Sequence, residues 1–189
     1  MEVRELDLPG VFEIVPRRFG DERGFFSEVH NAAALAEHGI DVGFVQDNHS
    51  FSAERGVLRG LHYQAEPFAQ AKLVRVTRGR IFDVAVDVRR GSPHYGRWVG
   101  LEVSAERWNQ IFVPEGFLHG FVTLEPACEV VYKVSAPYNA EADGAVAHDD
   151  PALGVEWPVP PAERILSQKD RAAPRLADAN LPFSYKEPA

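Results

Sequence analysis

From Val45 onward the hydrophobic and polar positions form patterns typical of short β-strands, of which a period of two is the clearest. The segment IFDVAVDV (81–88) places Phe82 and three valines on one face, with Ile81, Ala85 and two aspartates on the other. Further short strands are predicted at 72–76, 97–103, 110–114, 120–124 and 129–134. Turn sequences rich in glycine and proline separate them at close intervals. The pattern predicts an all-β protein.

One helix signal stands out in the first half of the chain. In NAAALAEHG (31–39), Asn31 suits the N-cap and Gly39 suits the C-terminal stop. Because long helices do not alternate with the strands, we expect a sandwich or a barrel, and a jelly-roll barrel with short peripheral helices is the most economical form for this length. The proline-rich end lacks the apolar content for a core of its own. The sequence therefore predicts a single domain over 1–189, with a core of about 10–160 and an irregular C-terminal tail, 161–189, that wraps the barrel.

Composition narrows the class of protein. The 189 residues are 45% hydrophobic and 25% charged, which is an ordinary balance for a folded domain. The net charge of −8 argues against a nucleic-acid surface, although a few local arginines can still hold a small anion. The charged N-terminus and the lack of a long apolar run predict a cytoplasmic protein with no membrane segment. The single Cys128, in an apolar stretch, is expected to be a buried structural thiol.

Several polar residues interrupt otherwise apolar strands: His62, Lys72, Asp83, His119 and Tyr132. Each alone has a structural explanation, such as a hydrogen-bonded scaffold histidine or an aspartate that faces solvent. Charged groups inside a barrel are costly, however, so this many positions together indicate a pocket with a function.

The stretch GVLRGLHYQ (56–64) carries two of the candidate residues at opposite parity. Strict alternation would send the side chains of Arg59 and His62 to opposite faces of a strand. Gly60 lies between them, and a glycine-permitted bulge can re-aim both side chains into one pocket. We therefore expect an irregular strand here that forms the floor of a site.

A metal site is not expected. Pro114, Gly116 and His119 form a P-x-G-x-x-H element similar to that of the cupin superfamily, whose metal-binding members carry two histidines one residue apart on an earlier strand. The corresponding run here is His62-Tyr63-Gln64, and an amide is a poor ligand for a transition metal. A metal-dependent cupin oxygenase is thus the less favoured hypothesis.

Acid–base chemistry without a metal fits the residue types better. Proton abstraction next to a carbonyl needs a base, a group that stabilises the enolate oxygen and an acid that returns the proton. His62 suits the base, Lys72 the enolate partner and Tyr132 the acid. A histidine base also needs a carboxylate that orients it, and both Asp83 and Asp170 are candidates between which the residues alone do not choose.

A family resemblance rests on a series of motifs. RGLHYQ, QAKLVRVTRGRIFDVAVDVRRGSP, VPEGFLHGFVTL, EVVYKV, DDPALGVEWP and LSQKD occur in this order. They closely resemble the dTDP-4-dehydrorhamnose 3,5-epimerases from about Gly10 to Leu176. The resemblance implies a cupin-type jelly roll, a homodimer and no metal or organic cofactor. It also implies an isomerase that inverts C3 and C5 of dTDP-4-dehydro-6-deoxy-D-glucose on the route to dTDP-L-rhamnose.

The resemblance also assigns residues by position. It makes His62 the base, Tyr132 the acid, Lys72 the partner of the C4 oxygen and Asp170, rather than Asp83, the partner of His62. Tyr138 matches the residue that stacks on the thymine. The positions matched to substrate binding are Arg23, Glu28, Gln46, Asn48, Arg59, His119, Tyr138, Asp143 and Lys169.

Three departures from the family pattern cluster after Tyr138. Asp143 replaces a usual glutamate, and Ala140 and His148 stand where proline and tryptophan are common. Two other functions remain open: an epimerase that inverts only C3 or only C5 of another dTDP-deoxysugar, and a non-catalytic cupin that binds a nucleotide sugar. For the homodimer, the strand-like N-terminal segment 3–15 is a candidate for pairing across the subunit boundary.

Overall fold

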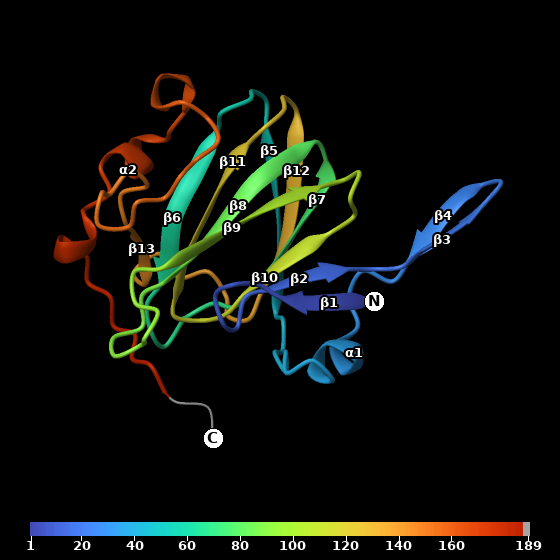
Figure 1. The fold of residues 1–189 in the computed structure, drawn as a ribbon, viewed down its shortest axis with the longest axis horizontal. Coiled ribbons are helices and arrows are strands. Elements are labelled where there is room, and N and C mark those ends of the chain that lie inside the picture. The colour runs from blue at the N-terminus through green and yellow to red at the C-terminus, as the bar shows by residue number, and fades with distance from the viewer. Residues whose placement is uncertain (187–189) are drawn as a thin grey trace.

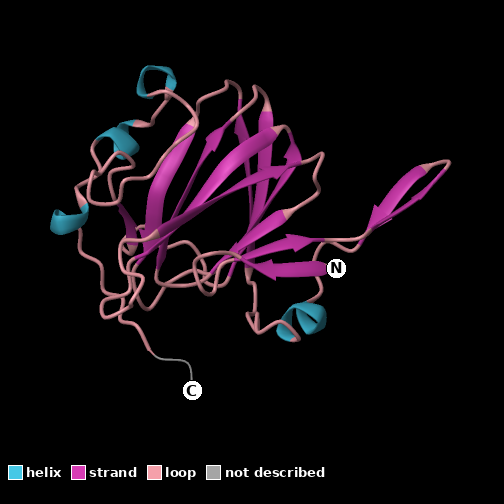
Figure 2. Cartoon of the chain, in the orientation of Figure 1, coloured by secondary structure: helices cyan, strands magenta, loops and turns pink. Residues whose placement is uncertain are grey.

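The alternating strands pair into two large antiparallel sheets that pack face to face (Figure 1). The structure is a computed structural model that describes residues 1–186. Short helices and loops surround the two sheets (Figure 2), and no helix within the described residues is long and apolar enough to cross a membrane. The all-β jelly-roll architecture with short peripheral helices is as predicted.

The strand order is that of an open sandwich. The six-stranded sheet runs β1 (Glu2–Glu5), β2 (Phe12–Val15), β10 (Gln110–Val113), β7 (Lys72–Arg78), β12 (Cys128–Val134) and β5 (Gln46–Ser52). The five-stranded sheet runs β13 (Asp143–Ala145), β6 (Leu58–Gln64), β11 (Phe117–Thr123), β8 (Arg80–Asp87) and β9 (Trp98–Ser104). The remaining elements are the hairpin β3 (Arg18–Asp21) and β4 (Gly24–Ser27), the helices α1 (Ala32–Ala36) and α2 (Gln168–Arg171), and 3₁₀ turns at Pro161–Glu163 and Leu176–Asp178.

Strand β8 is buried on both faces. Ile81 packs in the core between the two sheets, while Val84 packs against Trp157 and other residues of the C-terminal segment, which covers the outside of the five-stranded sheet. Asp83 and Asp87 are therefore wholly buried, and the alternative in which they face solvent is wrong. Each carboxylate is instead satisfied by local partners, as burial of a charge requires.

Helix α1 lies over the outer face of the six-stranded sheet. Asn31 caps it, since its side-chain oxygen accepts a hydrogen bond from the Ala34 amide at 3.1 Å. Leu35 packs against Leu73 of that sheet, and the chain leaves the helix through Gly39 at a φ of +80°. The predicted cap and stop are confirmed.

A bulge in β6 interrupts the regular alternation of side chains between Arg59 and His62. His119 of β11 pairs with His62 and Phe121 pairs with Arg59, so β6 advances three residues where β11 advances two. Gly60 has a φ of +131°, and a Cβ there would lie 2.6 Å from the Cα of Gly120. The predicted glycine-dependent bulge is confirmed.

The β3–β4 hairpin projects away from both large sheets (Figure 1). Its aromatic side chains Phe19, Phe25 and Phe26 are more than half exposed. Phe19 and Phe26 are register partners, but the adjacent Phe25 and Phe26 interrupt the alternation of polar and apolar residues that revealed the other strands. The hairpin was not predicted from the sequence.

The N-terminal segment and the cysteine have simple structural roles. Strand β2 pairs with β1 and β10 of the same chain, which leaves the outer edge of β1 at the border of the sheet. Cys128 is fully buried, as expected, and burial raises the pKa of its thiol.

Candidate active site

A deep cleft opens between the two sheets. Its main chamber has a volume of about 470 Å³, and an adjoining chamber has about 210 Å³. The two chambers share the side chains of His62, Lys72, Tyr132 and Lys169. Cavities of this size are typical of sites that bind small molecules or cofactors.

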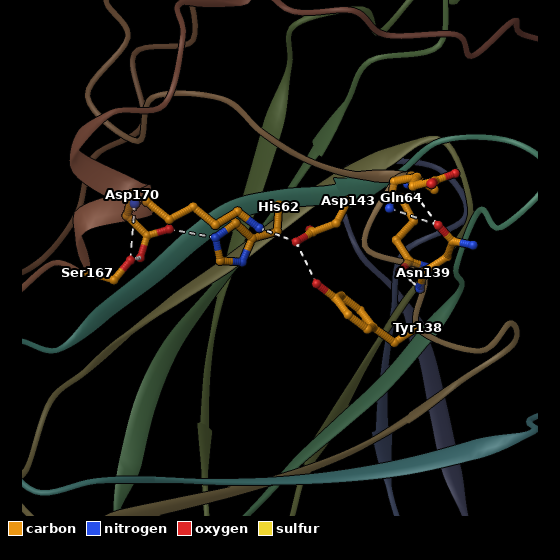
Figure 3. Close-up of polar contacts among 10 residues, drawn as sticks. His62, Gln64, Tyr138, Asn139, Asp143, Ser167 and Asp170 are labelled. Carbon is orange, nitrogen blue, oxygen red and sulfur yellow. Dashed lines mark hydrogen bonds and ion pairs between the residues drawn. The ribbon is translucent and has the colours of Figure 1, made fainter.

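His62 and Asp170 form a hydrogen-bonded pair in this cleft (Figure 3). The imidazole Nε2 lies 2.6 Å from Oδ1 of Asp170, and the bulge at Gly60 turns His62 toward the interior of the sandwich. Asp170 comes from the first turn of α2, a segment 108 residues further along the chain. The sequence left Asp83 and Asp170 as candidate partners of His62, and in the structure the partner is Asp170.

The environment of Asp170 keeps its carboxylate ionised. Burial alone would raise its pKa, but hydrogen bonds from His62, from the hydroxyl of Ser167 and from the Gly60 amide outweigh burial and lower the pKa below its ordinary value. An ionised carboxylate only accepts hydrogen bonds, so the neutral imidazole carries its proton on Nε2. The Nδ1 lone pair of His62 is then free to accept a proton from a ligand.

A second histidine–carboxylate pair lies next to the first. His119 and His62 are register partners on β11 and β6, and Nε2 of His119 lies 2.9 Å from each carboxylate oxygen of Asp83. Both members of this second pair are buried, and His119 lines the main chamber. Asp83 is thereby committed to His119.

Lys72 and Tyr132 reach the cleft from the six-stranded sheet, opposite His62. Burial lowers the pKa of Lys72 to about 8, although the negative charges of Asp83 and Asp143 act the other way. Burial raises the pKa of the Tyr132 phenol, which the positive charge of Arg59 opposes. Near neutral pH, Lys72 remains largely cationic and Tyr132 keeps its proton.

The adjoining chamber is lined by polar side chains that form hydrogen bonds with one another. The phenol of Tyr138 donates to Oδ2 of Asp143 at 3.3 Å, and Lys169 donates to the same carboxylate oxygen (Figure 3). The side-chain oxygen of Gln46 accepts a hydrogen bond from the Tyr138 backbone amide at 3.1 Å, and its side-chain amide donates to Oδ1 of Asn48 at 2.8 Å. The Tyr138 side chain is well exposed, so its ring face is available to a flat ligand.

Arg59 lies in the main chamber with weak polar contacts. Its guanidinium donates to the carbonyl oxygen of Phe51 at 3.2 Å and to the hydroxyl of Ser52 at 3.4 Å. No carboxylate within the described residues forms an ion pair with Arg59. A guanidinium with this freedom can form charge-assisted hydrogen bonds to an anionic ligand.

Gln64, where a metal-binding cupin carries its second histidine, supports a loop. Its carbonyl oxygen accepts the Asn139 amide at 2.8 Å, and its side-chain amide donates to the backbone oxygens of Phe68 and Pro137. Among residues 1–186, no three His, Cys, Asp or Glu side chains are placed to hold a metal ion together.

The structure brings together nearly all of the residues predicted for the site. Those that line the two chambers are His62, Lys72, Tyr132, Asp170, Gln46, Asn48, Arg59, His119, Tyr138, Asp143 and Lys169. Arg23 and Glu28 do not line them. Arg23 is at the tip of the projecting hairpin, where it pairs with Asp21, and Glu28 accepts a hydrogen bond from Asn31.

The C-terminal segment adds residues that sequence reasoning missed. Ile165, Leu166 and Ser167 line the main chamber beside Asp170, and Ser50 lines it from β5. The run Ser167-x-x-Asp170 has the form of a helix N-cap, and this signal was available in the sequence. Of the departures from the family pattern, Asp143 is part of the site. His148 is buried outside both chambers.

Comparison with known proteins points to one family. The sequence profile described as dTDP-4-dehydrorhamnose 3,5-epimerase matches residues 5–178. The dTDP-4-dehydrorhamnose 3,5-epimerase of Sinorhizobium fredii is 51% identical over 98% of this chain and 94% of its own length. The enzyme of that name from Pseudomonas aeruginosa is 50% identical over 95% and 98%.

Solved structures agree in fold. The dTDP-6-deoxy-D-glucose-3,5-epimerase of Legionella pneumophila, in complex with dTDP-4-keto-L-rhamnose, superposes with a TM-score of 0.93 at 41% identity, over 98% of this chain and 99% of its own. A 3'-monoepimerase from Streptomyces bikiniensis, in complex with dTDP-quinovose, reaches 0.84 at 36% identity, over 91% and 86%. The chain belongs to the dTDP-4-dehydrorhamnose 3,5-epimerase family.

Proposed function

We propose that the chain is an isomerase that inverts C3 and C5 of dTDP-4-dehydro-6-deoxy-D-glucose, giving dTDP-4-dehydro-L-rhamnose for the synthesis of dTDP-L-rhamnose. The observation that carries the proposal is the His62–Asp170 pair on one sheet with Lys72 and Tyr132 on the facing sheet of the same cleft. Both carbons flank the C4 ketone, so one set of acid–base groups next to that ketone serves both inversions.

His62 is the base in this proposal. Its Nδ1 takes the proton from C3 or C5, and the electron pair of the broken C–H bond moves toward the C4 oxygen to form an enolate. The imidazolium that results is stabilised by the ionised carboxylate of Asp170 at 2.6 Å. Because Asp170 also fixes the ring and its tautomer, His62 needs no rearrangement before it reacts.

Lys72 stabilises the enolate. An ammonium group in a poorly hydrated cleft interacts strongly with a nearby anionic oxygen. With its pKa lowered to about 8 by burial, Lys72 is mostly protonated at neutral pH. It therefore supplies the positive charge beside the C4 oxygen without a metal ion.

Tyr132 completes the inversion from the other side of the sugar ring. Its phenol donates a proton to the carbon face opposite His62, and the electron pair returns from the enolate to form the new C–H bond and restore the ketone. Tyr132 then regains a proton and His62 loses one through solvent, so the reaction is a net isomerisation. The support for this role is that Tyr132 and His62 belong to facing sheets.

The remaining cleft residues are proposed to hold the nucleotide. Arg59 suits the diphosphate, because its guanidinium has no carboxylate partner within the described residues. The exposed ring of Tyr138 suits the thymine, and Gln46 and Asn48 offer amides beside it. Since Asp143 already pairs with Lys169, we propose that it orients Lys169 and Tyr138 in this chain. His119, fixed by Asp83, is proposed to contact the sugar.

A homodimer is the proposed active form. Arg23 and Glu28 match substrate-binding positions of the family but lie outside this chain's own cleft, at or near the projecting hairpin. The exposed phenylalanines of that hairpin are apolar surface that a second copy would bury. In this arrangement the hairpin of one subunit completes the cleft of its partner.

The likeness to a 3'-monoepimerase keeps a single-carbon epimerase as the second candidate. Incubation of the enzyme with dTDP-4-dehydro-6-deoxy-D-glucose in deuterated water separates the two functions. NMR and mass spectrometry of the product should find deuterium and inverted configuration at both C3 and C5. Deuterium at one carbon alone would assign the single-carbon reaction, and unchanged substrate would remove the epimerase proposal.

A further inference from the structure

We propose that Ser167 is a positioning residue of the active site, whose hydroxyl fixes the carboxylate of Asp170 and thereby holds His62 in its reactive orientation. The inference rests on the proposed function, because it assigns Ser167 to the proton-abstracting pair. Ser167 itself does not bond to His62. It acts through Asp170.

The two residues form reciprocal hydrogen bonds. The Ser167 hydroxyl donates to Oδ2 of Asp170 at 2.6 Å, and the Asp170 amide donates to Oγ of Ser167 at 3.1 Å. The other carboxylate oxygen, Oδ1, is taken by His62 at 2.6 Å. Each oxygen thus has its own side-chain donor, one on either side of the carboxylate (Figure 3), and rotation of the carboxylate about its bond to Cβ would break both contacts.

The surrounding chain explains why this contact matters. Helix α2 has four residues, too few to be rigid on its own. The segment before it is tied to the start of β6 and the residues just before that strand by two backbone hydrogen bonds: the Leu58 amide donates to Ile165 at 2.9 Å, and the Ile165 amide donates to Gly56 at 2.8 Å. Between that anchor and Asp170, the Ser167 side chain is the cap that sets the start of the helix.

Burial does not oblige Ser167 to make this bond. The side chain is exposed at the rim of the main chamber, so its hydroxyl is free to bond to water instead. The hydroxyl donates to Asp170 because the two residues are placed for reciprocal hydrogen bonds, and not because burial leaves it no other partner. The consequence of this bond is electrostatic as well as geometric, because the Ser167 hydroxyl is one of the donors that offset burial and lower the pKa of Asp170.

The other ionisable groups near Asp170 act from different elements. His62 bonds to it from β6. His148, in the segment after β13, interacts with the charge of Asp170, and burial lowers the pKa of His148. Lys169, its neighbour in α2, donates to Asp143 instead. Ser167 is an uncharged side-chain donor to Asp170, beside the Gly60 amide, so its removal leaves the nearby charges unchanged.

Ser167→Gly and Ser167→Thr form a matched test. Glycine removes the hydroxyl but is tolerated at an N-cap, whereas threonine keeps both the cap and the donor, and the exposed position has room for its methyl group. In S167G we expect kcat to fall about tenfold or more while KM changes less than about twofold. The acidic limb of the kcat/KM profile should also move to higher pH, because the His62–Asp170 pair retains its proton more strongly. S167T should restore both properties.

A double-mutant cycle with Asp170→Asn isolates the path of the effect. If Ser167 acts through Asp170, S167G should reduce the activity of D170N by less than about twofold. Circular dichroism and dTDP affinity check that the variants are folded. Wild-type enzyme without epimerase activity would defeat the proposed function itself. The Ser167 inference is overturned separately if wild type is active and S167G matches it, or if S167G is impaired with an unshifted pH profile and an equal loss in the D170N background.

Discussion

His62 and His119 are opposite each other on neighbouring strands, and each imidazole holds a different carboxylate. Asp170 reaches His62 from the C-terminal segment, whereas Asp83 reaches His119 from the adjacent strand of the same sheet. The pair that includes His62 is open to the cleft, with 30% of the His62 side chain exposed against 8% for His119. The more accessible histidine, His62, therefore has the proton-abstracting role in the proposed mechanism.

Replacement of His62 tests that assignment. His62→Asn removes the base but keeps a polar group of similar shape, and kcat should fall by at least about 100-fold, the usual effect of losing a general base. Steady-state kinetics on the nucleotide sugar measure the loss. His38→Asn, at an exposed histidine in the loop after α1, is the matched control and should behave as wild type. Comparable activity in H62N would remove His62 from the mechanism.

Lys72 predicts an alkaline limit to activity. The ammonium form is the one that stabilises the enolate, and burial lowers its pKa to about 8, so Lys72 is charged below that pH and neutral above it. We expect kcat/KM, which reports the ionisation of the free enzyme, to decline above about pH 8 in wild type. In Lys72→Arg the guanidinium stays charged, so any residual activity should persist to higher pH. An alkaline limb at the same pH in both proteins would assign the titration to another group.

Gly60 predicts a large effect of a small substitution on stability. In Gly60→Ala the new methyl group would lie 2.6 Å from the Cα of Gly120, at a φ of +131° that L-residues rarely adopt. The free energy of unfolding should fall by about 3 kcal/mol, as steric overlap and backbone strain add. Chemical denaturation measures this change.

Gly43→Ala is the control for that substitution. Apart from its two chain neighbours, no residue has an atom within 4 Å of a Cβ at position 43, and the backbone there is not in the left-handed region. Its effect should stay within about 0.5 kcal/mol. If both alanine variants were equally stable, the close approach of β6 and β11 would not constrain Gly60.

The proposed exchange of hairpins predicts complementation between two damaged subunits. Arg23→Ala and His62→Asn should each lower activity as homodimers. In a heterodimer of the two, purified by two different tags, one cleft has both an intact His62 and an intact Arg23 from the partner. Such a heterodimer should show about half of wild-type activity per dimer. If the heterodimer were no more active than the damaged homodimers, Arg23 would act in the cleft of its own chain. A monomeric mass for wild type would contradict the homodimer.

The strands and the β6 bulge could be predicted because they leave local signals. Alternation marks β8, and Gly60 between two polar residues of opposite parity marks the bulge. Asn31 and Gly39 bracket α1 in the same way. Each of these features depends on residues a few positions apart, where side-chain direction follows from backbone geometry.

Long-range pairing could not be read from such patterns. The choice between Asp83 and Asp170 for His62 depends on how the C-terminal segment folds back over β6, and no local period encodes that path. Family resemblance supplied this choice where periodicity did not. The β3–β4 hairpin escaped prediction for another reason: neither of its faces is buried within the chain, so its sequence carries no apolar alternation.

Hydrogen exchange in Tyr132→Phe tests the central claim, that base and acid attack the sugar from opposite sheets. In deuterated water, wild type should couple deuterium incorporation at C3 and C5 to inversion. In Y132F, His62 can still remove each proton and return a deuteron to the same face, so NMR should find exchange with configuration retained. Loss of exchange in parallel with inversion in Y132F, or exchange that survives in H62N, would contradict the account.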